Sequence, residues 1–92
     1  MNQSILFPDL QDWDSQTQSV VFPVQVQGAN IECLISLNRL TQLSSVVFEQ
    51  NNDGLEAKAL AVFEEYRFDI EEEVEMLIEQ ELFDEQGRVV LI

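Results

Sequence analysis

Carboxylates are the side chains in this sequence whose number and spacing could support chemistry. They crowd the stretch Phe63–Leu82, FEEYRFDIEEEVEMLIEQEL, where Glu71 and Glu75 stand one helical turn apart. Paired carboxylates can act as a general acid and a general base, but catalytic carboxylates are usually desolvated in a cleft. No apolar residues cover this side of the predicted helix. We therefore interpret these carboxylates as a solvated face and expect no catalytic residues.

Other kinds of reactive site lack their residues. The sequence has no histidine and a single cysteine, which excludes Ser-His-Asp and Cys-His nucleophiles, histidine metal sites and a zinc or iron–sulfur site within one chain. The three glycines fall at predicted turns and form no phosphate-binding motif. The segment 51–56 lacks the spacing of a calcium loop. We predict that the protein is not an enzyme and binds no cofactor and no metal; a carboxylate- or metal-dependent enzyme is the least favoured alternative.

The net charge of −14 limits the choice of partners. Eighteen acidic residues face four basic ones, which are Arg39, Lys58, Arg67 and Arg88. Nucleic acids and anionic membranes are bound by cationic surfaces, so we expect neither as a partner. An acidic surface fits high solubility or a basic protein partner.

Length and composition predict one domain over residues 1–92. A hydrophobic content of 46% is enough for a core despite the charge. There is no apolar run near 18 residues and no basic stretch before an apolar one, so we expect neither a membrane span nor a signal peptide. Cys33 cannot form an internal disulfide, and its alternating position predicts a buried, inert thiol. These features together favour the cytoplasm.

Two consecutive helices are predicted in the second half of the chain. In the later helix Ile70, Val74, Leu77 and Ile78 share one face, and Asp69 with Glu72 has the spacing of a capping box. The earlier helix would begin after Asp53, which has Glu56 three residues on, and would present an apolar face that consists of Leu55, Ala59, Val62, Phe63 and Tyr66.

The joint between these helices carries the candidate binding residues. Arg67 and Phe68 lie at the corner, and Phe68 is expected to pack onto the next helix as a hydrophobic staple. Whether Arg67 pairs with Asp69, with Glu71 or with neither stays open. The candidate partner-binding residues are Tyr66, Arg67, Phe68, Glu71, Glu72 and Glu75.

A β-hairpin is predicted from Ser19–Val26 and Ile31–Ser36, because apolar residues alternate along both segments. Pro23 has no N–H to donate, so we prefer a four-residue loop, Gln27–Asn30, that points its nitrogen away from the partner strand. The strand would then be an edge, or bulged, on its other side. This register places Val26 opposite Ile31, Val24 opposite Cys33 and Phe22 opposite Ile35.

The remaining elements are short. We expect a strand at Ser4–Phe7, a loop over 9–18 with Trp13 lying over the edge of the core, and a helix Leu37–Leu43 capped by Ser36. The apolar triplet 46–48 either extends that helix or anchors a loop. A turn at 84–87 precedes a strand, Arg88–Ile92, that is expected inside the sheet or covered; as an exposed edge it would favour self-association.

The predicted fold class is α+β, a small antiparallel sheet of three to four strands with two to three helices packed on one face. The apolar face of the hairpin would pack on the two later helices.

The order of several blocks also resembles a known family. MNQSILFPD, then Trp13-Asp14, then VVFPVQVQG leading into IECLIS, and finally FEEYRFDIEEEVEMLI are similar to the small bacterial YrdB-like family, which is catalogued as a domain of unknown function. The resemblance covers nearly the whole chain. The chain is longer than its relatives at 44–52, has Phe68 where they favour Trp, and has fewer aromatic residues in its last strand. The resemblance implies a compact bacterial cytoplasmic domain, with no activity attached.

Two functional hypotheses follow. The first is a non-enzymatic interaction or regulatory domain that presents an acidic helical face to a basic protein partner. The alternative is a structural or regulatory homodimer that associates through the edge beside Pro23 or through the last strand.

Overall fold

The computed structural model describes residues 4–48 and 54–92, which form five strands and three helices. The prediction of an α+β fold is confirmed, with one strand more than the three to four expected. The elements, in chain order, are β1 (Ile5–Leu6), β2 (Asp12–Asp14), β3 (Ser19–Val26), β4 (Ala29–Ser36), α1 (Leu37–Ser44), α2 (Leu55–Glu65), α3 (Arg67–Glu79) and β5 (Val89–Leu91).

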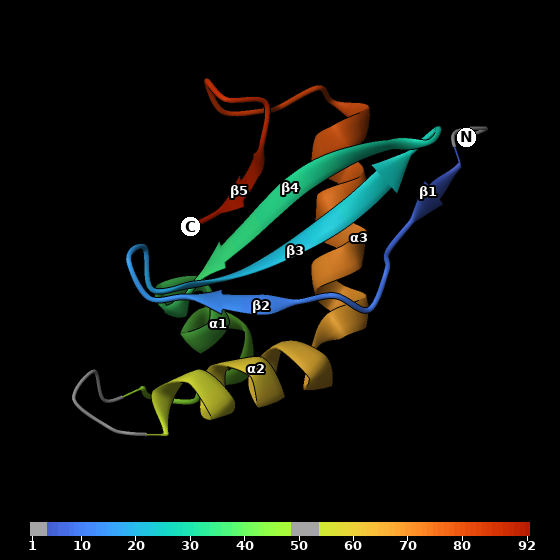
Figure 1. Ribbon diagram of the computed structural model, residues 1–92. Helices are drawn as coiled ribbons and strands as arrows, with labels where there is room; N and C mark the ends of the chain where they lie inside the picture. Colours follow the sequence, from blue (N-terminus) through green and yellow to red (C-terminus); the bar gives the residue numbers. More distant parts are fainter. Residues whose placement is uncertain (1–3, 49–53) are drawn as a thin grey trace.

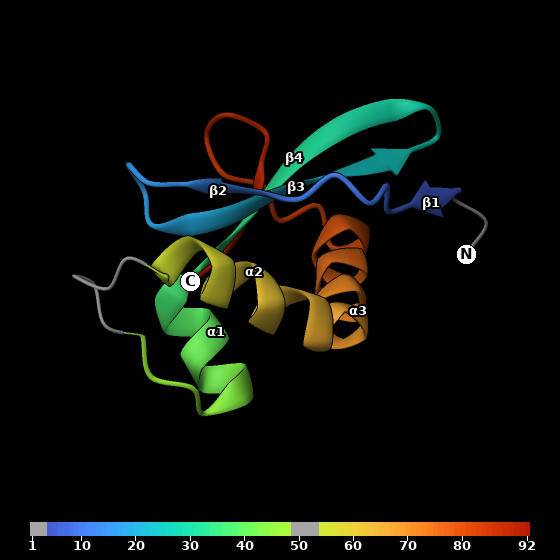
Figure 2. The same ribbon diagram turned by 60° about the horizontal axis from the view of Figure 1, so that its bottom comes forward.

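All three helices lie on the same side of the sheet, as expected (Figures 1 and 2). The strand order is β1-β3-β4-β5, and β2 also pairs with β3. The pairings are antiparallel except between β4 and β5, which are parallel. We call the side with the helices the covered face and the other side the open face. The sheet is thus mixed rather than wholly antiparallel, because the chain crosses over through the helices before it returns as β5.

The core fills the space between the covered face and the helices. Val20, Phe22 and Val24 of β3 alternate with residues that point to the open face, and each is at most 2% exposed. They meet α2 and α3, where the ring centroids of Phe22 and Phe63 are 4.9 Å apart. The predicted apolar face of α3 is confirmed, because Ile70, Val74 and Ile78 are buried and Leu77 packs against them.

The predicted four-residue loop of the hairpin is wrong. β3 has its predicted bounds, whereas β4 begins two residues earlier than predicted, at Ala29. The structure has a two-residue turn, Gln27-Gly28, so Val24 pairs with Ile31 and Phe22 with Cys33. Both turn residues have positive φ, 53° and 87°, as a type I′ turn requires. The shift relative to the predicted register is two residues, which leaves every side chain on its predicted face.

Pro23 interrupts the outer edge of β3, and this confirms the expected break. Proline has no N–H to donate to a ladder. β1 pairs with Gln25 and Val26, and β2 pairs with Ser19–Val21, so β3 lacks a strand partner on this side at 22–24. The connecting residues 7–11 span this gap, which is a bulged edge. The finding of β2 also corrects the expected loop over 9–18. Trp13, on β2, packs partly buried against the core as predicted.

The helix boundaries differ from the predictions at the corner. α1 begins after Ser36, whose hydroxyl accepts a hydrogen bond from the Arg39 N–H at 3.1 Å, as predicted. α3 begins at Arg67 instead of after Asp69, because the Ile70 N–H already donates to the Tyr66 carbonyl at 3.0 Å. A single residue, Tyr66, therefore separates the two helices. The predicted cap Asp53 lies outside the described residues.

The ends of the remaining segments follow their local chemistry. Residues 45–48 form a loop, in which Val46 and Phe48 pack against the core and Val47 is exposed. The predicted turn at 84–87 is confirmed: the Asp84 carboxylate accepts hydrogen bonds from the Gln86 and Arg88 backbone N–H groups. The bond from the Arg88 backbone lowers the pKa of Asp84. β5 is an edge strand of the described sheet rather than an inner one, but its Val89 and Leu91 side chains are buried, so the expected alternative of a covered strand holds for them.

Candidate functional site

The corner between α2 and α3 is held by Arg67. Its guanidinium Nε donates to Glu71 at 2.7 Å and one terminal nitrogen donates to Gln11 at 3.0 Å. The other terminal nitrogen donates to the carbonyl oxygens of Phe7 and Pro8, at 3.3 and 3.1 Å. The Arg67 side chain is 18% exposed. These contacts tie the connection between β1 and β2 to the helix corner.

Further acceptors complete this network. Arg67 also lies within 3.4 Å of Asp9 and 3.3 Å of Glu64, and its guanidinium stands 5.6 Å from the centre of the Phe63 ring. Gln11 in turn donates to Glu64. The open question of the pairing of Arg67 is answered in favour of Glu71. The donors of Arg67 are occupied within the chain. Its guanidinium therefore holds the corner together and is not free to bind a partner.

The six candidate residues therefore divide into two groups. Tyr66 packs partly buried against the core, and Arg67 and Glu71 bond to each other. In contrast, Phe68, Glu72 and Glu75 are exposed on the side of α3 that faces away from the sheet. The expected staple by Phe68 is wrong: its side chain is 83% exposed, because the earlier start of α3 places it about half a helical turn from Ile70.

The exposed residues form a continuous band, which we call the acidic stripe. Its members share one face of α3 through steps of three, four and seven residues. Two members were not among the candidates: Asp69, and Met76, whose side chain is 49% exposed. Both follow from the helical spacing once Phe68 and Glu72 are placed on the outer face. The acidic stripe consists of Phe68, Asp69, Glu72, Glu75 and Met76.

A shallow depression of about 600 Å³ lies beside the acidic stripe. Asp69, Glu72 and Met76 line it, together with Glu73 and with Arg39 of α1. Arg39 and Glu73 form an ion pair that joins α1 to α3, and both side chains are about one quarter exposed. This pair neutralises one wall, whereas the carboxylates of the stripe have no ion pair within the described residues.

All four basic residues have contacts inside the chain. Arg39 pairs with Glu73, Arg67 with Glu71, and Arg88 with Asp84 at 2.8 Å. Lys58 donates to the Val47 carbonyl at 3.2 Å and lies 5.9 Å from the centre of the Phe48 ring. Apart from the acidic residues in these arginine ion pairs and Asp9 and Glu64 beside Arg67, the carboxylates within residues 4–48 and 54–92 have no counter-ion there, which the sequence count alone could not show.

The described residues carry none of the usual signs of a metal or membrane site. Residues 4–48 and 54–92 hold no group of three or more His, Cys, Asp or Glu side chains that could bind a metal ion. None of the helices in these ranges is long and apolar enough to cross a membrane. Cys33 is fully buried, and its burial raises the pKa of its thiol from 9.0 to about 12. The thiol is inert at neutral pH, as predicted.

Comparisons with known proteins find relatives in sequence and in fold. Residues 5–91 match the family described as protein of unknown function (DUF1488). The uncharacterized protein YrdB of Escherichia coli is 40% identical over 91 residues, and that of Shigella flexneri is 38% identical; each match covers 99% of both chains. A crystal structure of a DUF1488 protein of unknown function from Shewanella loihica is 44% identical, with a TM-score of 0.85, and the match covers 99% of this chain and 94% of that one.

Proposed function

We propose that this chain, which belongs to the DUF1488 family of proteins of unknown function, is a non-enzymatic cytoplasmic interaction protein whose acidic stripe binds a basic protein segment. The observation that supports this proposal is which charged side chains have partners within the molecule. Every basic side chain is engaged inside the molecule, whereas Asp69, Glu72 and Glu75 face solvent without a counter-ion in the described structure.

The apolar members of the stripe define the partner more closely. Phe68 and Met76 are two turns apart on the same face, with Glu72 between them. Large exposed apolar side chains among polar ones are typical of contact surfaces, and methionine adapts to partners of different shape. A basic amphipathic segment would place apolar residues on Phe68 and Met76 and its Lys or Arg residues beside the carboxylates.

A charge-neutralisation experiment tests this proposal. The variant Glu72→Gln/Glu75→Gln is compared with Glu56→Gln/Glu85→Gln, which removes the same charge at exposed positions outside the stripe. Tagged proteins capture partners from a bacterial lysate at low salt, and the affinity of each captured protein is then measured after purification. An exposed ion pair contributes about 0.2–1 kcal/mol, so two lost pairs should weaken binding about fivefold.

A further variant, Phe68→Ala, tests the apolar contact, with Val47→Ala as a control at another largely exposed apolar position. We expect the stripe variants to lose a partner that both controls retain. If all four variants retain the same proteins, or lose them in proportion to net charge, the acidic stripe is not the binding surface and the proposal fails.

The homodimer is a second candidate, because β5 is an edge strand of the described sheet. An edge strand offers backbone groups to a strand of another copy, and Ile92 beside it is 79% exposed. Light scattering at high micromolar concentration tests this function. A mass equal to that of one chain at every concentration rules it out.

A further inference from the structure

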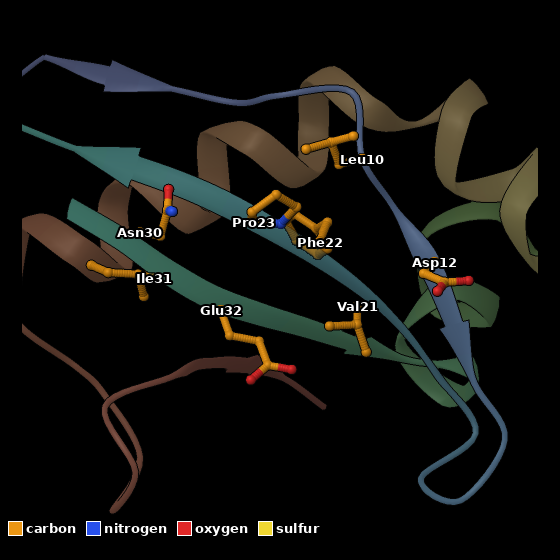
Figure 3. Close-up of a pocket in the computed structure, with 8 residues that line it drawn as sticks. All are labelled: Leu10, Asp12, Val21, Phe22, Pro23, Asn30, Ile31 and Glu32. Atoms are coloured by element: carbon orange, nitrogen blue, oxygen red, sulfur yellow. The ribbon is translucent and has the colours of Figure 1, made fainter. Parts of the chain in front are cut away.

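The open face of the sheet carries a groove at the bulge beside Pro23 (Figure 3). Its volume is about 330 Å³. It exists because residues 7–11 span the unpaired stretch of β3 instead of lying against it. Phe22 and Ile31 also border it from the layer below. We call this depression the sheet groove; the open-face side chains that line it are Leu10, Asp12, Val21, Pro23, Asn30 and Glu32.

The strand register sets the chemistry of the sheet groove. Asp12 pairs with Val21, which pairs with Leu34, so these side chains form one row across the open face. Pro23 pairs with Glu32 in the next row. The centre is therefore apolar, made by Val21 and Pro23, and a carboxylate stands on either side of it.

The two carboxylates lie on strands that flank β3, and Figure 3 shows Val21 between them. Neighbouring strands are about 4.8 Å apart, and Glu32 lies two residues, about 7 Å, along β4 from the row of Asp12, so roughly 12 Å separates the backbones of Asp12 and Glu32. Neither side chain has an ion pair in the described part of the chain, and the basic residues are committed elsewhere. The sheet groove thus combines an apolar floor with two unneutralised anionic walls.

We propose that the sheet groove binds a short extended segment of a partner protein that carries Arg or Lys next to aliphatic residues. Arg and Lys side chains bury their methylene stems on apolar surface while the charged head stays in water. A stem that crosses Val21 and Pro23 brings its head between Asp12 and Glu32. An extended segment would lie over the open face at the bulge, where Leu10 closes one side.

The same charges disfavour a second copy of this chain as the occupant. Contact between two open faces would bring Asp12 and Glu32 of one copy towards those of the other, and each copy has a net charge of −14. Like charges at close range oppose association. The inference goes beyond the proposed function, because it concerns the opposite side of the molecule and depends on no residue of the acidic stripe.

The test uses a defined probe, the fluorescein-labelled peptide Val-Arg-Val-Arg-Val. Two matched peptides replace either the arginines with glutamate or the valines with glycine. Binding is followed by fluorescence anisotropy at physiological salt, and the site is mapped by amide chemical shifts of ¹⁵N-labelled protein. We expect the Val-Arg peptide to bind most tightly and to shift the amides of Asp12, Val21 and Glu32.

Variants separate the sheet groove from overall charge. Asp12→Asn/Glu32→Gln should weaken binding about fivefold, because two exposed ion pairs are lost. The control Glu56→Gln/Glu85→Gln removes equal charge elsewhere and should bind like the original protein. Val21→Lys supplies a cation of the protein's own between the two carboxylates, and it should abolish binding; an unchanged amide spectrum outside the groove shows that it is folded.

Three outcomes would overturn the inference. Equal binding of the glycine peptide means that the aliphatic residues next to the arginines make no contact with the sheet groove. Equal effects of the two double variants mean that the site lies elsewhere. Shifts confined to Phe68–Met76 mean that the probe occupies the acidic stripe, which would remove the sheet groove while leaving the proposed function intact. Weaker partner binding by the variants of the acidic stripe would not change the amide shifts expected in the sheet groove, so the two proposals can fail separately.

Discussion

The two faces of the sheet use neighbouring residues of the same strand in opposite ways. On the covered face Val20, Phe22 and Val24 are almost completely buried and contact the helices. On the open face Val21 and Pro23 alternate with them, stay partly exposed and lie among carboxylates without counter-ions. The comparison teaches that stability and binding can be separated along β3. Changes on one face should affect unfolding, and changes on the other should affect partners.

The largest effect is expected for Cys33, on the covered face, as a difference in thiol reactivity between the native and the unfolded protein. The pKa of its thiol is raised to about 12, so at pH 8 the reactive thiolate is about a thousandfold rarer than in an unfolded chain with a pKa of 9.0. Labelling by iodoacetamide should be slower in the native protein by at least that factor, because the thiol is also fully buried, and fast in denaturant. Labelling at equal rates in both states would contradict the buried position of Cys33.

The same shift gives a pH dependence with a defined sign. Because the folded pKa lies above the unfolded one, folding favours the neutral thiol. Its contribution to stability is complete below about pH 9 and declines as the pH rises towards about 12. Cys33→Ala should remove this part of the alkaline slope, as measured by urea unfolding at a series of pH values.

Truncation of Phe22, also on the covered face, should cause a large loss of stability. Phe22→Ala removes a 2% exposed ring that contacts Phe63, and large-to-small changes of this kind cost about 3–5 kcal/mol. Urea unfolding measures the loss. A cost below about 1 kcal/mol would mean that the core between β3 and α2 is not packed as described.

Arg67 joins the helix corner to the connection between β1 and β2, and Arg67→Met should have an intermediate effect on stability. The substitution keeps an apolar stem but leaves Glu71 and the carbonyls of Phe7 and Pro8 without their donor. We expect a loss of about 2 kcal/mol, because the guanidinium is largely buried and makes several charge-assisted hydrogen bonds. Hydrogen exchange should increase at 7–11, which form one side of the sheet groove.

A double-mutant cycle with Glu71→Gln isolates the ion pair within that loss. Additive effects of the two substitutions would show that Arg67 and Glu71 do not act together, whatever the cost of either change.

The smallest effect on stability is expected from Val21→Thr on the open face. Exposed substitutions away from special backbone positions usually change stability by less than about 0.5 kcal/mol. Threonine also suits a strand. The variant should unfold like the original protein, but it should bind the Val-Arg peptide of the groove experiment more weakly. A large loss of stability here would mean that the open face is covered in solution, as in a dimer.

The sequence predicts the covered face well and the pairing less well. Alternation assigns Phe22, Val24 and Cys33 to one face, but a two-residue slip leaves that assignment unchanged, so the pattern cannot distinguish the two registers. The turn decides between them, and Gln27 is an uncommon residue for the first position of a turn with positive φ. The parallel pairing of β5 depends on a crossover that no local signal contains.

The candidate site shows the same limit. Helical spacing places Phe68, Glu72 and Glu75 on one side of α3, and the structure agrees. The role of Arg67 was not predictable, because its acceptors Phe7, Pro8 and Gln11 lie more than fifty positions away. The sheet groove arises from a similar distant arrangement, although Pro23 did indicate a break at its edge.

The pairing of β4 with β5 has a consequence for the order in which the protein folds. Cys33 faces Val89, so this ladder closes a loop that contains all three helices. Contacts between residues so distant along the chain carry a high entropic cost and form late, whereas the β3–β4 hairpin is local and can form early. Until β5 arrives, the edge of β4 is open to strands of other chains. The high negative charge then has a further effect, because repulsion between unfinished molecules protects that edge during folding.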